Sequence, residues 1–571
     1  MSAAPAARPP RVVSAASRGG MRPWLLGAAG VALLLAALPP LSLWPLALLV
    51  PWPLTLLALE APSGGRAFRR LYLAGLPFFL LGTAWLAQTT WLNIVLVAVA
   101  EAGWVGFYGW IAWRGLRGRG FMPALPLLWT THELLRLKGP LSGYPWLLLG
   151  HALARSPIAV QAADLGGVLL LSFVAACGSA AVLAGRAGQR RGACAALAVL
   201  ALAAGYGLVR PLTLGEPLPG PVLAGIQPAI PQVLKDDSTR AEDRYRQCVQ
   251  LSWEALRADP APDLLVWPET MWPEPVGEGR AEDRWFPDFG PQEAAEQERQ
   301  MLRPLVRAGP LGSRARPLLL GAQYLRLDAE GQLRSSNSAL YLDATGARLG
   351  RYDKVMLVPA GETVPLKRYL PAPLRRVVEQ WIVDFAGYVI DLQPGTGPMT
   401  FELPATPPAA SAAEGAANSA SADPAPPAAR VSFGVTICFE NAYGSYCREF
   451  VRQGAEFLVN LSNEAWFGTS TEFDQMELHS ILRAVETRRA LFRSTNSGIS
   501  CLVLPDGRAP RGDRRLVVDG RDRAVAGTFR AAVPRYRDRS LYVLTGDAFG
   551  WLCLAVGAVL VFRRREPASV P

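Results

Sequence analysis

The sequence has few histidines and few cysteines, and this scarcity excludes several kinds of protein. Three histidines lie far apart and no C-x-x-C pair occurs, so we expect no metal site. The seven cysteines fall at irregular positions and do not form the pattern of a disulfide-bonded secreted domain. We therefore expect neither bound metal nor a disulfide framework.

Charged residues are also scarce, at 18% of the 571 residues against 50% hydrophobic, and the mean hydropathy is positive. The net charge of +11 would suit a nucleic-acid partner only if it formed a surface that binds phosphate. Instead, the basic excess lies in clusters beside apolar runs: Arg8, Arg11, Arg18 and Arg22; Arg66, Arg69 and Arg70; Arg114, Arg117 and Arg119; Arg186, Arg190 and Arg191; and Arg563, Arg564 and Arg565. Such clusters are typical of membrane proteins, so we expect no nucleic-acid partner.

Eight apolar runs are long enough, or nearly long enough, to cross a bilayer, which takes about 20 residues. They fall at 23–39, 41–59, 71–88, 91–113, 121–136, 163–185, 193–209 and 544–562. The second run follows the first at once, with no small-residue cleavage site between them. We therefore expect a retained span rather than a cleaved signal peptide.

The arginine clusters predict the orientation of these spans. With residues 1–22 as a cytoplasmic tail, every cluster lies on the cytoplasmic side, and only the loop with Arg136, Lys138 and Arg155 is basic on the outer side. Seven spans within 23–210 place the segment 215–541 outside the cytoplasm. The span at 544–562 then returns the chain to a cytoplasmic tail at 563–571.

The outer segment alternates strand-like and helical patterns, which favours an α/β layered domain. Strands are expected at 222–226, 264–267, 318–324, 339–343, 431–438, 457–461 and 499–504, and helices at 239–257, 293–306, 441–453 and 474–490. The stretch 404–429 is rich in Ala, Pro and Ser and has almost no large apolar residue. It is expected to be a disordered insertion.

Three reactive side chains in this segment each follow a strand-like run. Glu269 ends the run L-L-V-W-P-E, and Lys354 lies in G-R-Y-D-K-V-M-L-V-P at 350–359. Open α/β sheets hold ligands at the carboxyl ends of their strands. Taken alone, the glutamate could be a solvated loop residue and the lysine a surface side chain with its stem on apolar neighbours.

Cys438 is the third of these residues, in F-G-V-T-I-C-F-E-N at 433–441. A strand ends at this cysteine and a helix is expected to begin, and a helix N-terminus lowers the pKa of a thiol. The alternative is a buried apolar cysteine, which is expected for Cys177, Cys194, Cys248, Cys501 and Cys553.

Together the three segments resemble the Glu-Lys-Cys triad of the nitrilase superfamily, and the eight spans narrow the resemblance to the apolipoprotein N-acyltransferase family. The resemblance covers nearly the whole chain. The motifs that carry it stand in the family's order: L-S-G-Y-P-W at 141–146, W-P-E at 267–269, V-P-A-G-E-T-V-P at 358–365, I-C-F-E at 437–440, N-L-S-N-E-A-W-F-G at 460–468 and R-S-T-N-S-G at 493–498.

The resemblance implies a membrane helical bundle of about eight spans plus an extracytoplasmic nitrilase-type domain, an α-β-β-α sandwich. It implies a multi-pass protein of the bacterial inner membrane with the catalytic domain facing the periplasm, a monomer without a cofactor. In the implied reaction, Cys438 takes a fatty acyl group from a membrane phospholipid as a thioester. The acyl group then passes to the N-terminal amine of a diacylglyceryl-cysteine lipoprotein, with Glu269 as base and Lys354 stabilising the oxyanion.

Further residues of the resembling motifs are expected to support these three. Glu362, Glu440 and Asn463 are expected to orient the catalytic groups or substrate. Trp466 and Phe467 are candidates for a lipid-facing lid, with core packing as the alternative. The chain departs from the family at Gln227-Pro228-Ala229 and Lys235-Asp236, where Gln-Gly-Asn and Lys-Trp are usual. These departures concern the local substrate contacts and not the triad.

Two other functions fit parts of the sequence. A membrane-tethered amidase would share the triad and use water as the acceptor. A transporter or receptor would need ionisable residues inside the spans, for which Glu101 and Glu133 with His132 are the candidates.

Overall fold

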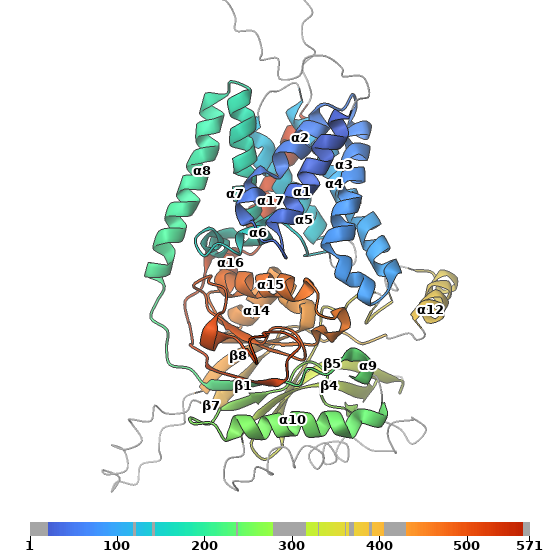
Figure 1. The fold of residues 1–571 in the computed structure, drawn as a ribbon, viewed down its shortest axis with the longest axis vertical. Helices are drawn as coiled ribbons and strands as arrows, with labels where there is room; N and C mark the ends of the chain where they lie inside the picture. The colour runs from blue at the N-terminus through green and yellow to red at the C-terminus, as the bar shows by residue number, and fades with distance from the viewer. Residues whose placement is uncertain are drawn as a thin grey trace, which may run out of the picture.

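The protein consists of a helical region stacked on an α/β region, as the computed structural model shows (Figure 1). The structure describes residues 21–117, 122–139, 143–235, 238–273, 275–277, 316–328, 331–359, 361–364, 370–386, 391–404 and 430–563. The helix expected at 293–306 and the insertion expected at 404–429, apart from Pro404 itself, lie outside these residues.

The helical region contains the N-terminal helices and the last helix of the chain. In chain order these are α1 (Arg22–Ala37), η1 (Trp44–Leu49), α2 (Pro51–Leu59), α3 (Gly64–Gly82), η2 (Ala84–Gln88), α4 (Trp91–Leu116), η3 (Met122–Ala124), α5 (Leu125–Leu137), α6 (Leu149–Leu153), η4 (Ala159–Ala162), α7 (Ala163–Arg186), α8 (Arg190–Val209) and η5 (Arg210–Thr213), where η marks a 3₁₀ turn. After α16 (Leu541–Thr545), the last helix α17 (Ala548–Phe562) returns to this region and packs against α4, α5 and α7.

Each of the eight apolar runs contains helix, but the helices differ in length from the expected spans. Among the described residues, three helices are long and apolar enough to cross a membrane, judged by length and composition: Trp91–Leu116, Ala159–Arg186 and Arg190–Thr213. Shorter apolar helices cover Arg22–Ala37, Trp44–Leu59 and Ala548–Phe562. The run at 41–59 is divided into η1 and α2, where proline at the start of α2 supplies no backbone N–H.

Glycines allow α3 and α4 to pack closely. A Cβ atom on Gly75 of α3 would lie 3.0 Å from the Ala102 Cα, and one on Gly109 of α4 would lie 2.8 Å from the Ala67 carbonyl oxygen. Small residues let helix backbones approach in this way, which is a usual means of helix association in membranes.

Among the described arginines, Arg22 begins α1, Arg114 is near the end of α4, Arg186 ends α7, Arg190 begins α8 and Arg563 follows α17. These helix ends lie at the end of the helical region that faces away from the sheets (Figure 1). Arg22 at the start of α1 forms an ion pair of 2.7 Å with Glu60, which follows α2. Arg114 at the end of α4 donates to the Val561 carbonyl near the end of α17 at 2.9 Å. The positive charges therefore surround one end of the bundle.

The basic loop that did not fit the charge pattern is neutralised in the fold. Each of its three cations pairs with an acid: Arg136 with Glu101 at 2.8 Å, Lys138 with Asp547 at 2.7 Å and Arg155 with Glu477 at 2.5 Å. Two of these acids, Glu477 and Asp547, lie far along the chain from the loop, and Asp547 directly precedes α17. The loop is therefore basic in sequence but balanced in charge in three dimensions.

Two mixed sheets form the α/β region. The first has the order β12-β1-β2-β4-β5-β6, with β3 paired to β4, and the second has the order β11-β10-β9-β8-β7. The strands are β1 (Val222–Gln227), β2 (Leu264–Val266), β3 (Val276–Gly277), β4 (Leu318–Leu327), β5 (Leu333–Leu342), β6 (Arg348–Asp353), β7 (Thr400–Pro404), β8 (Arg430–Ile437), β9 (Phe457–Ser462), β10 (Ala490–Thr495), β11 (Cys501–Val503) and β12 (Gly527–Ala532). Strands β1, β2 and β4 are mutually parallel, as are β8, β9 and β10.

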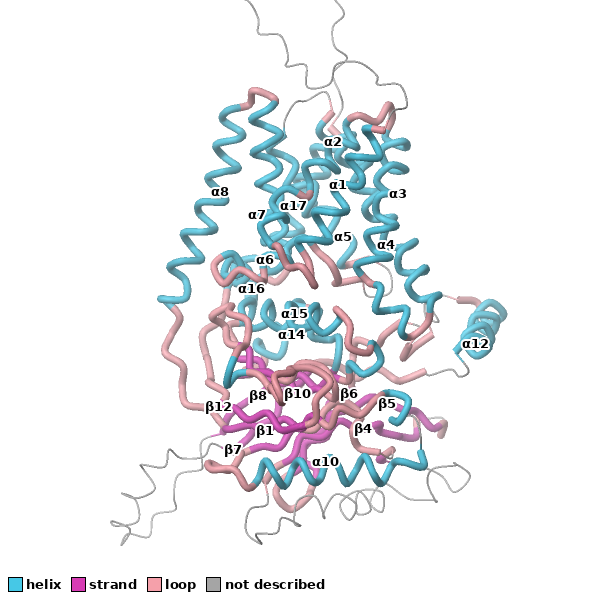
Figure 2. Tube along the Cα trace, viewed as in Figure 1, coloured by secondary structure: helices cyan, strands magenta, loops and turns pink. Residues whose placement is uncertain are grey.

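Helices cover the outer faces of both sheets and complete an α-β-β-α sandwich (Figure 2). Helix α10 (Ala241–Leu256) covers the first sheet, while α14 (Gly444–Arg452) and α15 (Glu472–Thr487) lie between the second sheet and the helical region. The remaining helices are α9 (Gln232–Lys235) and α12 (Ala372–Ala386), and the remaining 3₁₀ turns are η6 (Ser238–Arg240), η7 (Cys438–Ala442), η8 (Glu464–Phe467) and η9 (Gly512–Arg514).

Side chains alternate across the first sheet as a two-residue period requires. On β2 and just after it, Leu265 and Trp267 pack in the cluster under α10. Leu264 and Val266 belong to the cluster that contains the second sheet. The short, wholly apolar β2 is therefore buried on both faces.

Strands were found at every expected position, but the structure corrects other expectations. The helix expected at 474–490 ends at Thr487, and the polar stretch after it forms β10, with Arg488 in a left-handed conformation at φ +52° between them. The helix expected at 441–453 begins at Gly444, after the 3₁₀ turn η7. Strands β3, β6, β7, β10 and β12 were not expected.

A buried ion pair joins the two regions. Asp164 at the start of α7 accepts from Arg488 Nε at 2.9 Å and from Arg210 Nε at 2.9 Å, and the Tyr206 hydroxyl donates to it at 2.7 Å. Arg488 belongs to the α/β region and its side chain is almost fully buried. Among the residues that the structure describes, the ion-pair partner of Arg488 is therefore Asp164 of the helical region.

Replacing Asp164 by Asn should destabilise the protein by about 3–5 kcal/mol, because it leaves a buried arginine without a counter-charge. We expect a clear fall in the melting temperature of the detergent-solubilised protein. The matched control is Glu402→Gln, which breaks an exposed pair with Arg430 and should cost about 1 kcal/mol or less. Equal melting temperatures for the two variants would contradict this account.

Candidate active site

The three candidate residues lie at the carboxyl ends of strands from both sheets. Glu269 follows β2, Lys354 follows β6 directly, and Cys438 follows β8 directly. Since β2 and β6 belong to the first sheet and β8 to the second, the site lies where the ends of the two sheets meet. The structure brings all three residues together.

The Glu269 carboxylate is buried and accepts three hydrogen bonds. Lys354 Nζ donates to Oε1 at 3.3 Å, and Asn337 Nδ2 donates to the same oxygen at 2.7 Å. The backbone N–H of Asn463 donates to Oε2 at 2.8 Å. These donors come from three separate segments, so they hold the carboxylate in one orientation.

Lys354 is buried between two carboxylates. Its Nζ lies 2.9 Å from Glu362 Oε1 and 3.3 Å from Glu269 Oε1, and only 1% of its side chain is exposed. Burial alone would lower the pKa of Lys354, but the charges of Glu362 and Glu269 raise it well above its usual range. The side chain is therefore a fixed ammonium, as an oxyanion stabiliser needs to be.

Glu362 fixes that ammonium. Its Oε1 accepts from Lys354 and, at 3.1 Å, from Asn337 Nδ2, while its Oε2 accepts from the Val358 N–H at 2.9 Å. Asn337 therefore joins both carboxylates of the site. Sequence reasoning missed Asn337, because S-S-N-S at 335–338 has the composition of a loop and not of a central strand.

Cys438 has a left-handed backbone, with φ of +55°. This conformation costs a residue other than glycine roughly 1–3 kcal/mol, so surrounding contacts must hold it. Asn460 Nδ2 donates to the Cys438 carbonyl at 3.2 Å. The sharp turn lets the chain leave β8 and expose the half-buried cysteine at the end of the sheet.

The expected lowering of the thiol pKa by a helix N-terminus is wrong. Cys438 begins the 3₁₀ turn η7, which has only five residues. Burial and then the Glu269 carboxylate raise the pKa of the Cys438 thiol well above its usual range, although the Lys354 ammonium lowers it. The resting sulfur is therefore a protonated thiol close to a carboxylate.

Glu440 joins the segments that carry Lys354 and Cys438. Its Oε1 accepts from the backbone N–H groups of Val355 and Met356, at 2.7 and 3.0 Å. Its Oε2 accepts from the Ile437 N–H and the Tyr352 hydroxyl, both at 2.8 Å. Burial raises the pKa of Glu440 to about 7, against these hydrogen bonds, which lower it.

Asn463 connects the site to its surroundings through its side chain. Its Nδ2 donates to Gln232 Oε1 at 3.0 Å, and its Oδ1 accepts from Asn496 Nδ2 at 2.9 Å. In the segment 227–229, which differs from the usual family sequence, Gln227 is buried and accepts from Thr495 Oγ1 at 3.0 Å. Lys235 Nζ donates to Thr270 Oγ1, next to the site. Asp236 lies outside the described residues.

The two lid candidates differ in their surroundings. Phe467 packs edge-on against Trp85 of the helical region, with ring centroids 4.7 Å apart. Trp466 is 38% exposed and lies in the same 3₁₀ turn, η8. Phe467 therefore has the packing role, and Trp466 keeps a free face.

Among the other cysteines, one expectation was wrong. Cys177, Cys248, Cys501 and Cys553 are buried, but Cys194 is exposed on α8. In the described residues, no group of three or more His, Cys, Asp or Glu side chains is arranged to hold a metal ion.

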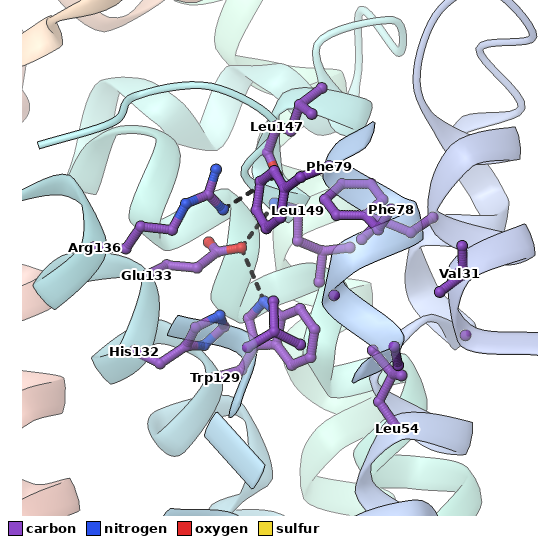
Figure 3. Close-up of a pocket in the computed structure, with 15 residues that line it drawn as sticks. Val31, Leu54, Phe78, Phe79, Trp129, His132, Glu133, Arg136, Leu147 and Leu149 are labelled. Carbon is purple, nitrogen blue, oxygen red and sulfur yellow. Dashed lines mark hydrogen bonds between the residues drawn. The ribbon is translucent and has the colours of Figure 1, made fainter. Parts of the chain in front are cut away.

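Two of the ionisable residues inside the helical region, Glu101 and Glu133, accept hydrogen bonds from neighbouring groups. Arg136 Nε donates to Glu101 at 2.8 Å. Glu133 Oε1 accepts from Trp129 Nε1 at 3.0 Å and from the Leu149 N–H at 2.8 Å (Figure 3). These bonds give the residues a structural role, in place of the transport role weighed for Glu101 and Glu133.

The cavity beside these residues is small. Its walls are apolar apart from His132, Glu133 and Arg136, and its volume is about 30 Å³. A water molecule needs roughly 10–15 Å³ measured in this way, so the cavity has room for a few waters at most and not for an acyl chain.

Known families match both regions of the chain. The carbon-nitrogen hydrolase family matches residues 223–512, and the apolipoprotein N-acyltransferase N-terminal domain matches residues 29–181. The chain therefore belongs to the carbon-nitrogen hydrolase family. The second match shows that the N-terminal helices are similar to the N-terminal domain of apolipoprotein N-acyltransferases.

Curated relatives identify the same branch. The apolipoprotein N-acyltransferase of Geobacter metallireducens is 29% identical, with 95% of this chain and 96% of the relative covered. That of Gloeobacter violaceus is also 29% identical, over 95% and 93% of the two chains. Among solved structures, the NitN amidase from Neterenkonia sp. AN1 is 16% identical with a TM-score of 0.32, covering 57% of this chain and 97% of that chain. The resemblance to apolipoprotein N-acyltransferases that the motifs indicated is confirmed.

The charge of Glu269 should control the reactivity of Cys438. Iodoacetamide reacts with the thiolate, and Glu269→Gln removes a charge that raises the thiol pKa. We expect faster alkylation of Cys438 near pH 7, by about tenfold for each unit that the pKa falls. The measurement is mass spectrometry of the peptide that contains Cys438, with Glu402→Gln as the exposed control. Slower alkylation of Glu269→Gln would contradict this electrostatic account.

Proposed function

We propose that this chain transfers a fatty acyl group from a membrane phospholipid, through a Cys438 thioester, to the N-terminal amine of a diacylglyceryl-cysteine lipoprotein. One observation carries the proposal: a thiol, a carboxylate and a buried ammonium meet at the strand ends of a domain attached to acyltransferase-type helices. The curated relatives share both regions over most of their length, which does not favour the amidase alternative.

In the first half-reaction, Glu269 takes the proton of the Cys438 thiol as the sulfur attacks the ester carbonyl of the phospholipid. The high pKa of the thiol supports this order, because the proton then leaves only when an electrophile is present. The Lys354 ammonium stabilises the oxyanion. The carbon–oxygen bond breaks, the glycerol oxygen takes the proton from Glu269, and the lysophospholipid leaves.

In the second half-reaction, the lipoprotein amine attacks the thioester carbonyl. Glu269 accepts a proton from the attacking nitrogen, and Lys354 again stabilises the oxyanion. The carbon–sulfur bond breaks, the sulfur recovers a proton, and an amide is formed. One carboxylate thus serves both steps, and the reaction needs no cofactor.

Glu362, Glu440 and Asn463 act as positioning residues in this proposal. Glu362 holds the Lys354 ammonium, Glu440 holds the Lys354 and Cys438 segments together, and the Asn463 N–H orients Glu269. The exposed Trp466 is placed to contact a lipid chain.

We further propose that the protein is a monomer that crosses the bacterial inner membrane eight times. Its spans lie within 23–210 and at 544–562, its tails 1–22 and 563–571 are cytoplasmic, and its catalytic domain at 215–541 faces the periplasm. The arginine clusters at one end of the bundle support this orientation. The opposite end of the bundle meets the catalytic domain, so in this proposal Cys438 works on the periplasmic side of the membrane.

Impermeant thiol reagents should test the orientation. In spheroplasts of a strain in which Cys194 and Cys438 are replaced by Ala, Glu402→Cys on exposed β7 should be labelled. Gly185→Cys at the end of α7 has open space around its Cβ and should be labelled only after lysis. Labelling of Gly185→Cys in intact spheroplasts would overturn the eight-span orientation.

The nucleophile should be tested by mass spectrometry after incubation with phospholipid. We expect a hydroxylamine-sensitive acyl adduct on Cys438 that is absent in Cys438→Ala, while Cys447→Ala, which alters a buried cysteine of α14, retains it. Lys354→Met should lower the acylation rate by about 10²–10³-fold, the scale of losing one oxyanion donor. Glu269→Gln should block acylation because its amide cannot accept the proton.

Two outcomes would contradict the proposal. An adduct on another cysteine in Cys438→Ala would show that the nucleophile is misassigned. A wild-type adduct that passes to water but never to a lipopeptide amine would favour the amidase.

A further inference from the structure

Three buried residues meet at the junction of the two regions around one side-chain amide. Gln475 of α15 accepts from Trp85 Nε1 at 3.0 Å and from Trp146 Nε1 at 2.8 Å, both through its Oε1. Its Nε2 donates to the Gly82 carbonyl at 3.0 Å. Trp85 lies in η2 and Trp146 in the loop before α6, so one amide of the α/β region binds two separate segments of the helical region.

A glutamine suits this position for a chemical reason. The amide oxygen has two lone pairs for two indole N–H groups, and the amide nitrogen supplies a donor for a carbonyl. A leucine of similar size would leave both indole N–H groups buried without a partner.

One of these tryptophans leads to the catalytic residues. The Trp85 ring packs edge-on against Phe467 at the end of η8. Asn463, directly before η8, donates its backbone N–H to Glu269 at 2.8 Å. A short path of contacts therefore runs from Gln475 through Trp85 and η8 to the carboxylate.

The other tryptophan leads into the helical bundle. The Trp146 carbonyl accepts from Arg136, which also pairs with Glu101 of α4 at 2.8 Å. The Trp146 ring lies against His479 of α15, with centroids 4.5 Å apart. Gln475 is thus connected through Trp85 to η8, and through Trp146 to the ion pair between α4 and α5.

We propose that Gln475 is a positioning residue. It fixes η8 relative to the helices along which a lipid reaches Cys438. The turn η8 contains the exposed Trp466 and is connected to Glu269 through Asn463. The inference rests on the proposed function, since it takes the acyl donor to be a bilayer phospholipid. Gln475 itself touches no reacting atom. Its removal should impair the use of a lipid donor and leave the chemistry of Cys438 intact.

The test compares two acyl donors for thioester formation on the full-length protein. One is phospholipid in mixed micelles, and the other is a short-chain nitrophenyl ester in water, which needs no lipid path. For Gln475→Leu we expect kcat/KM with phospholipid to fall about tenfold, the scale of one or two hydrogen bonds, mainly through KM. The rate with the soluble ester should stay within about twofold. The control Gln453→Leu, at an exposed position after α14, should change neither rate.

A second variant separates positioning from stability. In Gln475→Leu/Trp85→Phe/Trp146→Phe the unpaired N–H groups are removed, so the melting temperature should recover towards wild type. The defect with phospholipid should persist, because the Gln475 hydrogen bonds that fix η8 relative to the helical region are still missing. Recovery of full phospholipid activity together with stability would show a merely structural role and overturn the inference.

The remaining outcomes are also decisive. If Gln475→Leu does not fold, Trp85→Phe, which keeps a ring on Phe467 but loses one hydrogen bond, should show a weaker form of the same split. Equal loss with both donors, or no loss with either, would overturn the inference in either variant. If wild type forms no thioester from phospholipid but reacts with the soluble ester, the proposed function fails instead.

Discussion

The buried ammonium of Lys354 is the interaction on which the site depends. An unpaired charge in a protein interior is costly, and it is tolerated only where opposite charges and hydrogen bonds surround it. Here two carboxylates, Glu269 and Glu362, surround the nitrogen, and Asn337 bonds to both of them. The same arrangement serves chemistry, because it holds the Glu269 carboxylate beside the Cys438 thiol, whose pKa is raised by burial and by that carboxylate.

The two sheets are joined at the site by hydrogen bonds to backbone groups. Glu440 binds the N–H groups after β6 and the N–H group at the end of β8 with one side chain. Lys354 and Cys438 therefore cannot move apart without breaking several buried hydrogen bonds. The left-handed conformation of Cys438 is held against its intrinsic cost by the same contacts and by Asn460.

The sequence predicted the parts of the structure that follow from local pattern. Short apolar runs gave β1, β2, β8 and β9, and a reactive residue at the end of a run located Glu269 and Cys438. The sequence did not show β10, because R-S-T at its end is polar and is stabilised by burial against the first sheet, where Ser494 donates to the Val266 carbonyl. Asn337 and Gln475 were missed for the same reason, since only tertiary contacts distinguish them from ordinary polar residues.

The thiol pKa was the clearest failure of local reasoning. A strand followed by a helix suggested an activated thiolate, but burial and a carboxylate brought from a distant strand have the larger effect. The charge state of the Cys438 thiol is decided by groups that are close in three dimensions, and the neighbouring sequence alone does not show which groups these are.

Buried polar and charged contacts cross the surface between the catalytic domain and the helical region, beside the apolar core that the two regions share. Helix α15 meets the bundle with Gln475, Glu477, His479 and Glu486, and Arg488 follows it. Salt screens buried pairs much less than exposed ones, so moderate ionic strength should leave the pairs of Arg155 with Glu477 and of Asp164 with Arg488 in place. Washing the purified protein with salt should therefore not loosen the catalytic domain from the bundle.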